Sequence, residues 1–525
     1  MRLCGRVVAC CISVLLIIIC EVLVFHRHAG QKYTEKKDGT VYTHIREQKM
    51  SGTASSENRA PLISRQEKET EEHQQQRGHL RFDPKTCTVL PSAGVSTNGV
   101  KTPFKIYIYD LPKKFNLEIL KIYDVWHARC YSFEFCGFGA RLFNLESGVH
   151  VHDSHQFSLE VLVHHLLQLS PYRTLDPEQA DLFYIPAYIG LQCLYASFDN
   201  VSATNKLINE LFVYLQSQPY FASGKPHFSS LAKIEREMQS IGCCPYLLHP
   251  QSANITFLSI ERETRYQSAL NQRVITVPYP SYIHLDGSVT SRYQYLHSSS
   301  RNVFILLAAG TRRSNPYRSH ILDQFREKTH LSYPEYTATN QRRSEFPMVM
   351  YITKECDHSA KYSTVQWMLQ SVFCLQPPGD SPTRKSFYDA LLTGCVPVLF
   401  PYSGQGPVWA FQDRLNFTKF TVTIPYKYMM YSKNNSVYQY LAELPVQHVE
   451  SLQREVQRVA HWFQYSIPWG GADNAGGGDP VGEDSPRGGN IDEGGGSPLD
   501  TQDAMTMIYR ELENIIFPRS TNSIN

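Results

Sequence analysis

After residue 104, apolar and polar positions follow two alternating periods along the chain. Short apolar runs rich in β-branched and aromatic residues predict strands, at 105–109, 182–185, 274–277, 303–307, 348–352, 372–375 and 396–400. Apolar residues at helical spacing predict helices, at 157–169, 316–325, 364–369 and 386–392. Asp176 followed by Pro177 predicts one further helix start.

Strands that alternate with helices are typical of parallel sheets covered by helices. The pattern occurs in two blocks, which predict an α/β protein with two Rossmann-like domains facing a cleft. We assign 101–295 to an N-terminal domain and 300–465 to a C-terminal domain.

The N-terminal pattern differs from that of the body. Residues 7–25 form an apolar run interrupted by Ser13 and Glu21. As a helix the run would rise about 28 Å, close to the thickness of a bilayer core. We therefore predict a cytoplasmic tip and transmembrane anchor at 1–28. A cleaved signal peptide is the alternative, although its apolar region is normally shorter.

Two segments lack the apolar residues needed for a core. Residues 29–100 are polar, and they predict a disordered stem between anchor and body. Residues 470–498 are glycine-rich and acidic, and they predict a flexible insertion without chemistry of its own. Within 499–525, helical spacing returns at 500–517, so we expect a C-terminal helix that packs back on the body.

The composition indicates in which cellular compartment the protein folds. The 525 residues are 42% hydrophobic, and their net charge of +2 offers no general attraction to nucleic acid. Thirteen cysteines accompany four N-glycosylation sequons, a combination that fits the secretory pathway. The sequon asparagines are Asn200, Asn254, Asn416 and Asn434. Cysteine pairing stays open, but Cys374 and Cys395 lie in apolar runs and are predicted to be buried thiols.

The densest candidate chemistry lies between 373 and 389, where a predicted strand ends in a Pro-Gly loop and a helix begins. The groups there that can contact a bound nucleotide are Ser381, Thr383, Arg384, Lys385, Ser386 and Asp389. A helix N-terminus with two cations suits a diphosphate, and the carboxylate of Asp389 suits ribose hydroxyls. The alternative is a capped surface helix with solvated charges, and the spacing alone favours neither.

A second strand end offers further arginines. The predicted strand at 303–307 leads to Gly310, and Arg312 and Arg318 follow. Arginine binds phosphate oxygens with two parallel hydrogen bonds. Surface arginines before a helix are common, so the hypothesis depends on both strand ends facing one anion.

These residues carry a resemblance to a known family. The similar stretches are 107–116, 156–161, 180–186, 310–312, the run Phe373-Cys-Leu-Gln-Pro-Pro-Gly-Asp-Ser381, 383–386, Asp389 and 394–398. The chain resembles the exostosin-type glycosyltransferases, and within them the plant xyloglucan galactosyltransferase-like branch. The resemblance implies a GT-B fold, a UDP-sugar donor, inversion at the anomeric carbon, and a type II Golgi membrane protein with its body in the lumen. Lys385 departs from the family pattern, which has an arginine there.

Neither metal nor cofactor is expected. The chain has no Asp-x-Asp pair of the kind that holds a divalent ion on a diphosphate, and the basic groups can offset the charge instead. His150, His152 and His155 resemble a metal cluster, but satisfied or solvated histidines are the favoured interpretation. Inversion requires a general base from the N-terminal block, for which Asp153, His155 and Glu160 are the candidates.

We therefore predict an inverting transferase that moves a sugar, with galactose favoured, from a UDP-sugar to a polysaccharide or glycan acceptor. A glucuronosyl- or arabinosyl-type enzyme of the same family is one alternative. A non-catalytic scaffold in a complex with other glycosyltransferases is another.

Overall fold

The structure is a computed structural model. It describes residues 81–83, 87–90, 102–126, 133–146, 148–195, 201–240, 244–264, 274–286, 301–309, 316–326, 348–352, 358–400, 406–426, 428, 436–468 and 502–517. All of these belong to one compact unit, Gln74–Asn525. The predicted anchor and the predicted insertion lie outside the described residues. Within the described part of the chain, no helix is both long and apolar enough to span a bilayer.

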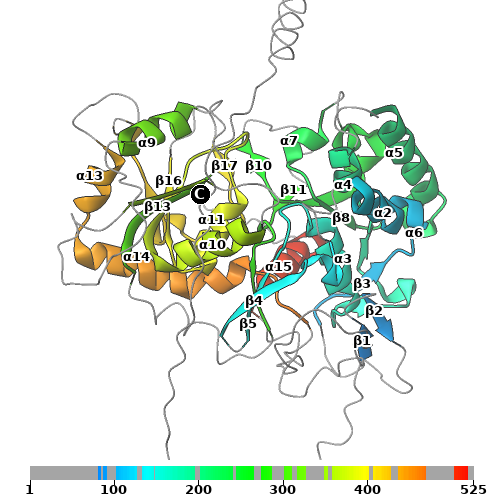
Figure 1. The fold of residues 1–525 in the computed structure, drawn as a ribbon. Coiled ribbons are helices and arrows are strands. Elements are labelled where there is room, and N and C mark those ends of the chain that lie inside the picture. Colours follow the sequence, from blue (N-terminus) through cyan, green and yellow to red (C-terminus); the bar gives the residue numbers. More distant parts are fainter. Residues whose placement is uncertain are drawn as a thin grey trace, which may run out of the picture. The chain divides into compact units, whose positions relative to one another are not determined.

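The N-terminal half contains a six-stranded parallel sheet (Figure 1). Its strands, in spatial order, are β11 (Val274–Thr276), β9 (Ile255–Ser259), β8 (His227–Leu231), β7 (Leu182–Tyr184), β3 (Ile106–Ile108) and β6 (Arg173–Thr174). The helices of this half are α2 (Leu117–Trp126), α3 (Leu159–Gln168), α4 (Ile189–Tyr195), α5 (Val201–Gln216), α6 (Pro219–Ala222) and α7 (Glu235–Met238). The predicted strands at 105–109, 182–185 and 274–277 and the helix at 157–169 are confirmed.

The C-terminal half contains a five-stranded parallel sheet. Its strands, in spatial order, are β14 (Met348–Ile352), β13 (Val303–Ala309), β15 (Ser371–Gln376), β16 (Val396–Leu399) and β18 (Val422–Thr423). Its helices are α9 (Pro316–Arg326), α10 (His358–Gln370), α11 (Lys385–Leu392), α13 (Val437–Ala442) and α14 (Val446–Val459). All seven residues of β13 are buried, as in a strand covered on both faces. The four strands and three helices predicted here are confirmed.

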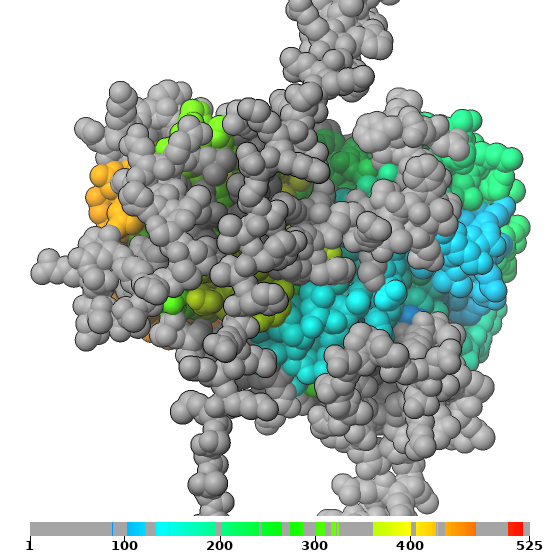
Figure 2. Space-filling view, in the orientation of Figure 1, coloured from blue at the N-terminus to red at the C-terminus, as the bar shows by residue number. Residues whose placement is uncertain are grey.

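Smaller elements join the two halves. Strands β12 (Ile283–Leu285), β5 (Val149–His152) and β4 (Arg141–Glu146) form an antiparallel sheet. A two-stranded ribbon pairs β10 (Arg262–Glu263) with β17 (Pro407–Val408), so it links the end of the first sheet to the second half. Figure 2 shows the surface on this side, with the N-terminal half in blue to green and the C-terminal half in bright green to orange.

Helix α15 (Ala504–Ile516) packs against both halves of the body. Asp503 begins it with a capping box, in which its side chain accepts from the Thr506 N–H. The Tyr509 hydroxyl donates to Ser170 in the N-terminal half. On the other side, Glu511 forms an ion pair with Arg414. The helix therefore ties together elements that are far apart in sequence.

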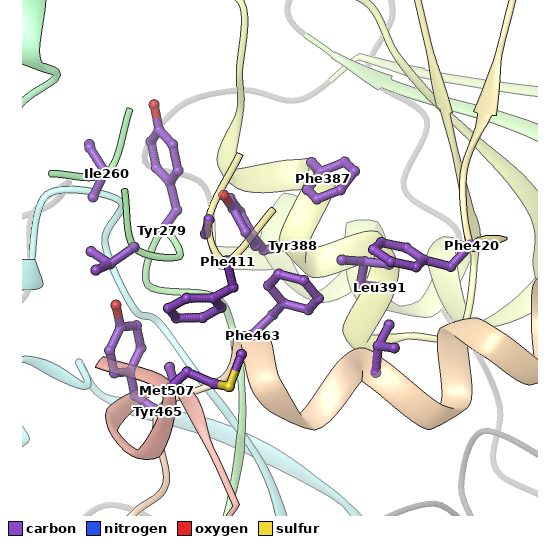
Figure 3. Packing of buried hydrophobic residues seen from close by; sticks show 14 of the residues in the cluster. Ile260, Tyr279, Phe387, Tyr388, Leu391, Phe411, Phe420, Phe463, Tyr465 and Met507 are labelled. Atoms are coloured by element: carbon purple, nitrogen blue, oxygen red, sulfur yellow. The ribbon is translucent and has the colours of Figure 1, made fainter. Parts of the chain in front are cut away.

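The hydrophobic core continues from one half into the other (Figure 3). Ile260 and Tyr279 come from the first half, whereas Tyr388 and Phe411 come from the second. Phe463, which follows α14, lies within ring-contact distance of both Tyr388 and Phe411. Burial of this shared apolar surface holds the two sheets together.

Three sequence predictions need correction. The predicted stem contains a hairpin, β1 (Arg81–Asp83) and β2 (Thr88–Leu90), and Cys87 in it is disulfide-bonded to Cys136. Order therefore begins before residue 100. The helix start at Asp176 leads only to a 3₁₀ turn, Pro177–Gln179. Cys374 and Cys395 are not thiols but a disulfide, and a further bridge joins Cys193 to Cys244.

Candidate functional site

The loop 377–384 connects the carboxyl end of β15 to the start of α11. Strand end and helix start are fastened to each other, because Gln376 and Ser386 exchange two hydrogen bonds. The Ser386 hydroxyl donates to Gln376 Oε1 over 2.6 Å, and Gln376 Nε2 donates to the Ser386 carbonyl over 3.1 Å. In open α/β sheets, ligands bind outside the carboxyl ends of the strands. The loop is therefore the first place to look for a ligand site, and we call it the donor loop.

Two guanidinium groups converge on the donor loop. Arg384 donates to the carbonyl of Pro377 over 3.1 Å, which folds its side chain back along the loop. Arg318, from α9, approaches Gly379 so closely that a Cβ on this glycine would lie 3.0 Å from Nη2. A side chain at residue 379 would therefore make the end of the Arg318 side chain shift by a few tenths of an ångström.

The charges of these two arginines oppose each other. Burial, followed by the positive charge of Arg318, lowers the pKa of Arg384 to about 9. An anion bound at this point would raise the pKa of Arg384 again, because a nearby negative charge favours the charged guanidinium and offsets the repulsion between the two cations. The arrangement fits a diphosphate, for which arginine has the matching geometry.

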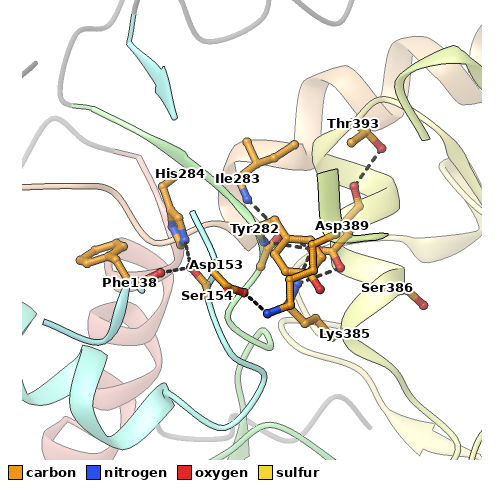
Figure 4. A network of polar contacts seen from close by, with 12 residues as sticks. Phe138, Asp153, Ser154, Tyr282, Ile283, His284, Lys385, Ser386, Asp389 and Thr393 are labelled. Atoms are coloured by element: carbon orange, nitrogen blue, oxygen red, sulfur yellow. Dashed lines mark hydrogen bonds and ion pairs between the residues drawn. The ribbon is translucent and has the colours of Figure 1, made fainter. Parts of the chain in front are cut away.

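Lys385 and Asp389, which the sequence assigned to the donor, are used differently (Figure 4). Lys385 Nζ lies 3.0 Å from both carboxylate oxygens of Asp389, and Asp389 is 3% exposed. Asp389 also accepts from the Ser281 hydroxyl over 2.6 Å and from the Tyr282 N–H over 3.0 Å. The Asp389 carboxylate therefore has several internal partners in this structure, and its contact with the ribose stays a prediction.

Lys385 is likewise turned away from the loop. Its ammonium lies 2.9 Å from the centroid of the Tyr282 ring, a cation–π contact. Burial lowers the pKa of Lys385 to about 8, and the charge of Asp389 opposes that shift. The sequence places Lys385 beside Arg384, but the helix turn sends the two cations to different partners.

Of the predicted bases, Glu160 is excluded by its surroundings. It is 0% exposed, and its oxygens accept the N–H groups of Gly190 over 2.7 Å and of Leu191 over 3.0 Å. Burial raises its pKa to about 8, against these hydrogen bonds. The carboxylate therefore fastens α3 to the first turn of α4, where no acceptor can reach it.

Asp153 and His155 have different surroundings from Glu160. Asp153 lies 2.5 Å from the Lys361 ammonium and is buried. His155 is partly exposed, and its Nδ1 accepts the N–H of Phe157 over 3.2 Å. Among the three candidates, His155 alone keeps substantial access to solvent.

The histidines at 150 and 152 have protein partners. His150 contacts Asn144 over 2.9 Å and Asp286 over 3.4 Å. His152 Nδ1 contacts the carbonyl of Gly139, and burial lowers the pKa of His152 to about 4. Within the described residues, no three His, Cys, Asp or Glu side chains are arranged to hold a metal ion.

Of the remaining predicted site and glycosylation residues, some lie within the described residues and some outside them. Gly310, Arg312, Asn200 and Asn434 lie outside the described residues. Asn254 and Asn416 are exposed, as glycosylation requires. Ser381 and Thr383 lie in the donor loop, but both donate to Glu261, a buried carboxylate that follows β9. Sequence reasoning missed Glu261, although an acidic residue directly after the apolar run 255–260 was the available signal.

Comparison with known proteins gives a family. A model of the exostosin GT47 domain matches residues 100–441. A xyloglucan-specific galacturonosyltransferase of Arabidopsis thaliana is 34% identical over 314 residues, which cover 57% of this chain and 44% of that protein. A probable xyloglucan galactosyltransferase of the same plant is 28% identical over 387 residues, covering 69% and 77%. The chain thus spans under half the length of the first relative.

Solved structures add no argument about the fold. The crystal structure of a GtfA/B complex has a TM-score of 0.27 and 11% identity, and the match covers 50% of this chain and 57% of that one. The description of the fold therefore rests on the two parallel sheets themselves.

Proposed function

Since the chain belongs to the exostosin GT47 family, we propose that its body transfers a sugar from a UDP-sugar to a polysaccharide or glycan acceptor. The observation that carries the proposal is the convergence of Arg318 and Arg384 on the donor loop at the carboxyl end of β15. Two neighbouring cations against a glycine form a receptor for the diphosphate of such a donor. The family relatives that act on xyloglucan support a plant-polysaccharide type of acceptor.

The chemistry assigns a role to each half. In the GT-B arrangement that we propose, the C-terminal half holds the donor and the N-terminal half presents the acceptor. As the glycosidic bond breaks, negative charge grows on the departing diphosphate, and the two arginines stabilise it. Inversion requires that a base take the proton of the attacking hydroxyl. We retain His155 for this role among the three predicted groups.

The donor is tested by a panel of UDP-sugars with the full chain purified in detergent. The panel contains UDP-galactose, UDP-galacturonate, UDP-glucuronate and UDP-arabinose, with a xyloglucan oligosaccharide as acceptor. We expect acceptor-dependent release of UDP, with UDP-galactose the favoured donor. Faster release from an acidic sugar or from arabinose would select the alternative donor. Release from none of them would leave the scaffold role.

We further propose a type II Golgi membrane protein with a lumenal body. The three disulfides among the described residues and the exposed asparagines of two sequons support an oxidising compartment. In cells, the protein should sediment with membranes and should shift in mass after deglycosidase treatment. A soluble protein without glycans would contradict this location.

A further inference from the structure

Glu261 makes the densest set of polar contacts between the first sheet and the donor loop. It follows β9, at the carboxyl end of the N-terminal sheet, and is 1% exposed. Its Oε2 accepts the Thr383 N–H over 2.7 Å and the Ser381 hydroxyl over 2.8 Å. The Thr383 hydroxyl donates to the same oxygen. Three donors of one loop thus converge on a single carboxylate oxygen of the other half.

Neighbouring contacts hold the same segment. Arg236, at the start of α7, donates to the Asp380 carbonyl over 3.0 Å. The backbone N–H of Gly379 donates to the Ser381 carbonyl over 2.9 Å, which closes the loop on itself. Asp380, Ser381 and Thr383 are therefore held by the N-terminal half, directly before Arg384.

These contacts change the interpretation of Ser381 and Thr383. An N–H and two hydroxyls that point the same way are the groups that a phosphate oxygen would accept from. In this structure, an internal carboxylate already occupies them. Arg318 and Arg384 are then the groups left for the diphosphate, and Ser381 and Thr383 act as anchors.

From this geometry we propose that Glu261 is a positioning residue for the nucleotide-sugar donor, which it serves by fixing the donor loop. The inference rests on the proposed function, because it assigns the loop to the donor. Fixing Thr383 also fixes the next residue, Arg384, whose guanidinium folds back onto Pro377. Without Glu261, the loop would sample conformations in which the two arginines no longer face one anion.

The cost of releasing the loop is measurable. Hydrogen bonds to a charged group contribute about 1.5–3 kcal/mol each. A loop that is already ordered in the free protein does not lose conformational entropy when the donor binds. If the affinity for the donor falls by the free energy of one such hydrogen bond, the Kd for UDP rises roughly 10- to 100-fold. The kcat with saturating donor should fall less, because a filled site can restore the loop.

The test compares Glu261→Gln and Glu261→Ala with Glu235→Gln in the full chain. Glu235 is a matched control because it is 0% exposed, and burial raises the pKa of both glutamates to about 7. Glu235 contacts Gln239 and Arg262, not the loop. Thermal melts exclude unfolding, and Ser381→Ala with Thr383→Val removes the partners of Glu261 if Glu261→Ala fails to fold.

Two readouts decide the proposal. Hydrogen–deuterium exchange of the peptide containing 377–386, without ligand, should rise in the Glu261 variants and stay unchanged in Glu235→Gln. Calorimetric titration with UDP should show the weaker Kd in the Glu261 variants only. Faster exchange with an unchanged Kd would overturn the positioning role, as would unchanged exchange.

The proposed function fails separately from this inference. If the wild-type chain binds neither UDP nor any UDP-sugar, the donor assignment of the whole loop is wrong, and the positioning role for a donor falls with it. If the wild type binds UDP and both Glu261 variants bind it equally well, only the role of Glu261 is wrong.

Discussion

The ammonium of Lys361 lies 2.5 Å from a carboxylate oxygen of Asp153, and both side chains are largely buried, at 12% and 6% exposure. The pair joins α10 of the C-terminal half to the segment that follows β5 in the N-terminal half. Removing one partner would leave a buried charge uncompensated, which costs about 3–5 kcal/mol.

We predict that Asp153→Asn and Lys361→Met each lower the free energy of unfolding, and that the double variant loses far less than their sum. Lys114 and Glu210 are the matched control, since they are also 2.5 Å apart but are 46% and 37% exposed. Their coupling should be about 1 kcal/mol or less. Denaturant unfolding of both cycles provides the comparison. Equal couplings would show that the first pair is effectively solvated.

Arg384 is the most direct test of the donor site. Arg384→Ala should lower kcat/KM roughly 10- to 1,000-fold, because a charge-assisted contact that strengthens in the transition state is lost. Arg384→Lys should recover part of this loss, since lysine keeps the charge but not the planar geometry. Arg454→Ala, an exposed substitution on α14, is the control. Normal kinetics for Arg384→Ala would refute the donor site.

The arginine pair also predicts how transfer responds to a chelator. If guanidinium groups offset the diphosphate charge, excess EDTA should leave the rate of UDP release largely unchanged. The measurement is the initial rate before and after chelation, followed by addition of manganese. A rate that collapses and returns only with manganese would contradict the prediction.

The Cys374–Cys395 bridge predicts a stability effect. It closes a loop with a sequence separation of 21 between strands β15 and β16. On the chain-entropy model, its loss costs about 3 kcal/mol. Cys374→Ser and Cys395→Ser should lower the melting temperature by similar amounts, and alkylation before and after reduction should report the bridge in the wild type. Free thiols at both positions in the unreduced protein would restore the original sequence prediction.

His227 predicts a dependence on pH. It is 2% exposed, and burial lowers its pKa from 6.5 to about 4. Below pH 6.5 His227 is protonated in the unfolded chain, whereas in the folded chain it is protonated only near pH 4. The unfolded state therefore binds more protons, and the free energy of unfolding falls as the pH falls. At pH 5 its penalty relative to pH 7 should be about 2 kcal/mol.

His227→Gln removes that proton. Urea unfolding at both pH values should therefore show a smaller loss for the variant than for the wild type. The difference between the two chains isolates His227 from the other buried histidines and glutamates, which titrate in both. Identical losses would mean that His227 is protonated in the folded state.

The sequence by itself determined the elements and their class. The strand predicted at 348–352 is observed with the same limits, and β13, β15 and β16 differ from prediction by one or two residues at their ends. Periodicity is a local property of the chain, so burial on one or both faces can be inferred from neighbours. The strand–loop–helix form of 371–392 follows for the same reason, as does the place of Arg384 at the helix start.

Only the tertiary structure decided which groups of the site are available. Asp389 finds Ser281 at a separation of 108 residues, and Glu261 finds Thr383 at 122. Such pairs depend on how the carboxyl ends of two sheets approach each other, and no local pattern records that approach. In the sequence, a carboxylate that binds a ligand therefore looks the same as one that has an internal partner. Folding gave Asp389 and Glu160 internal partners and brought in Glu261, because a buried charge must find a partner wherever the chain supplies one.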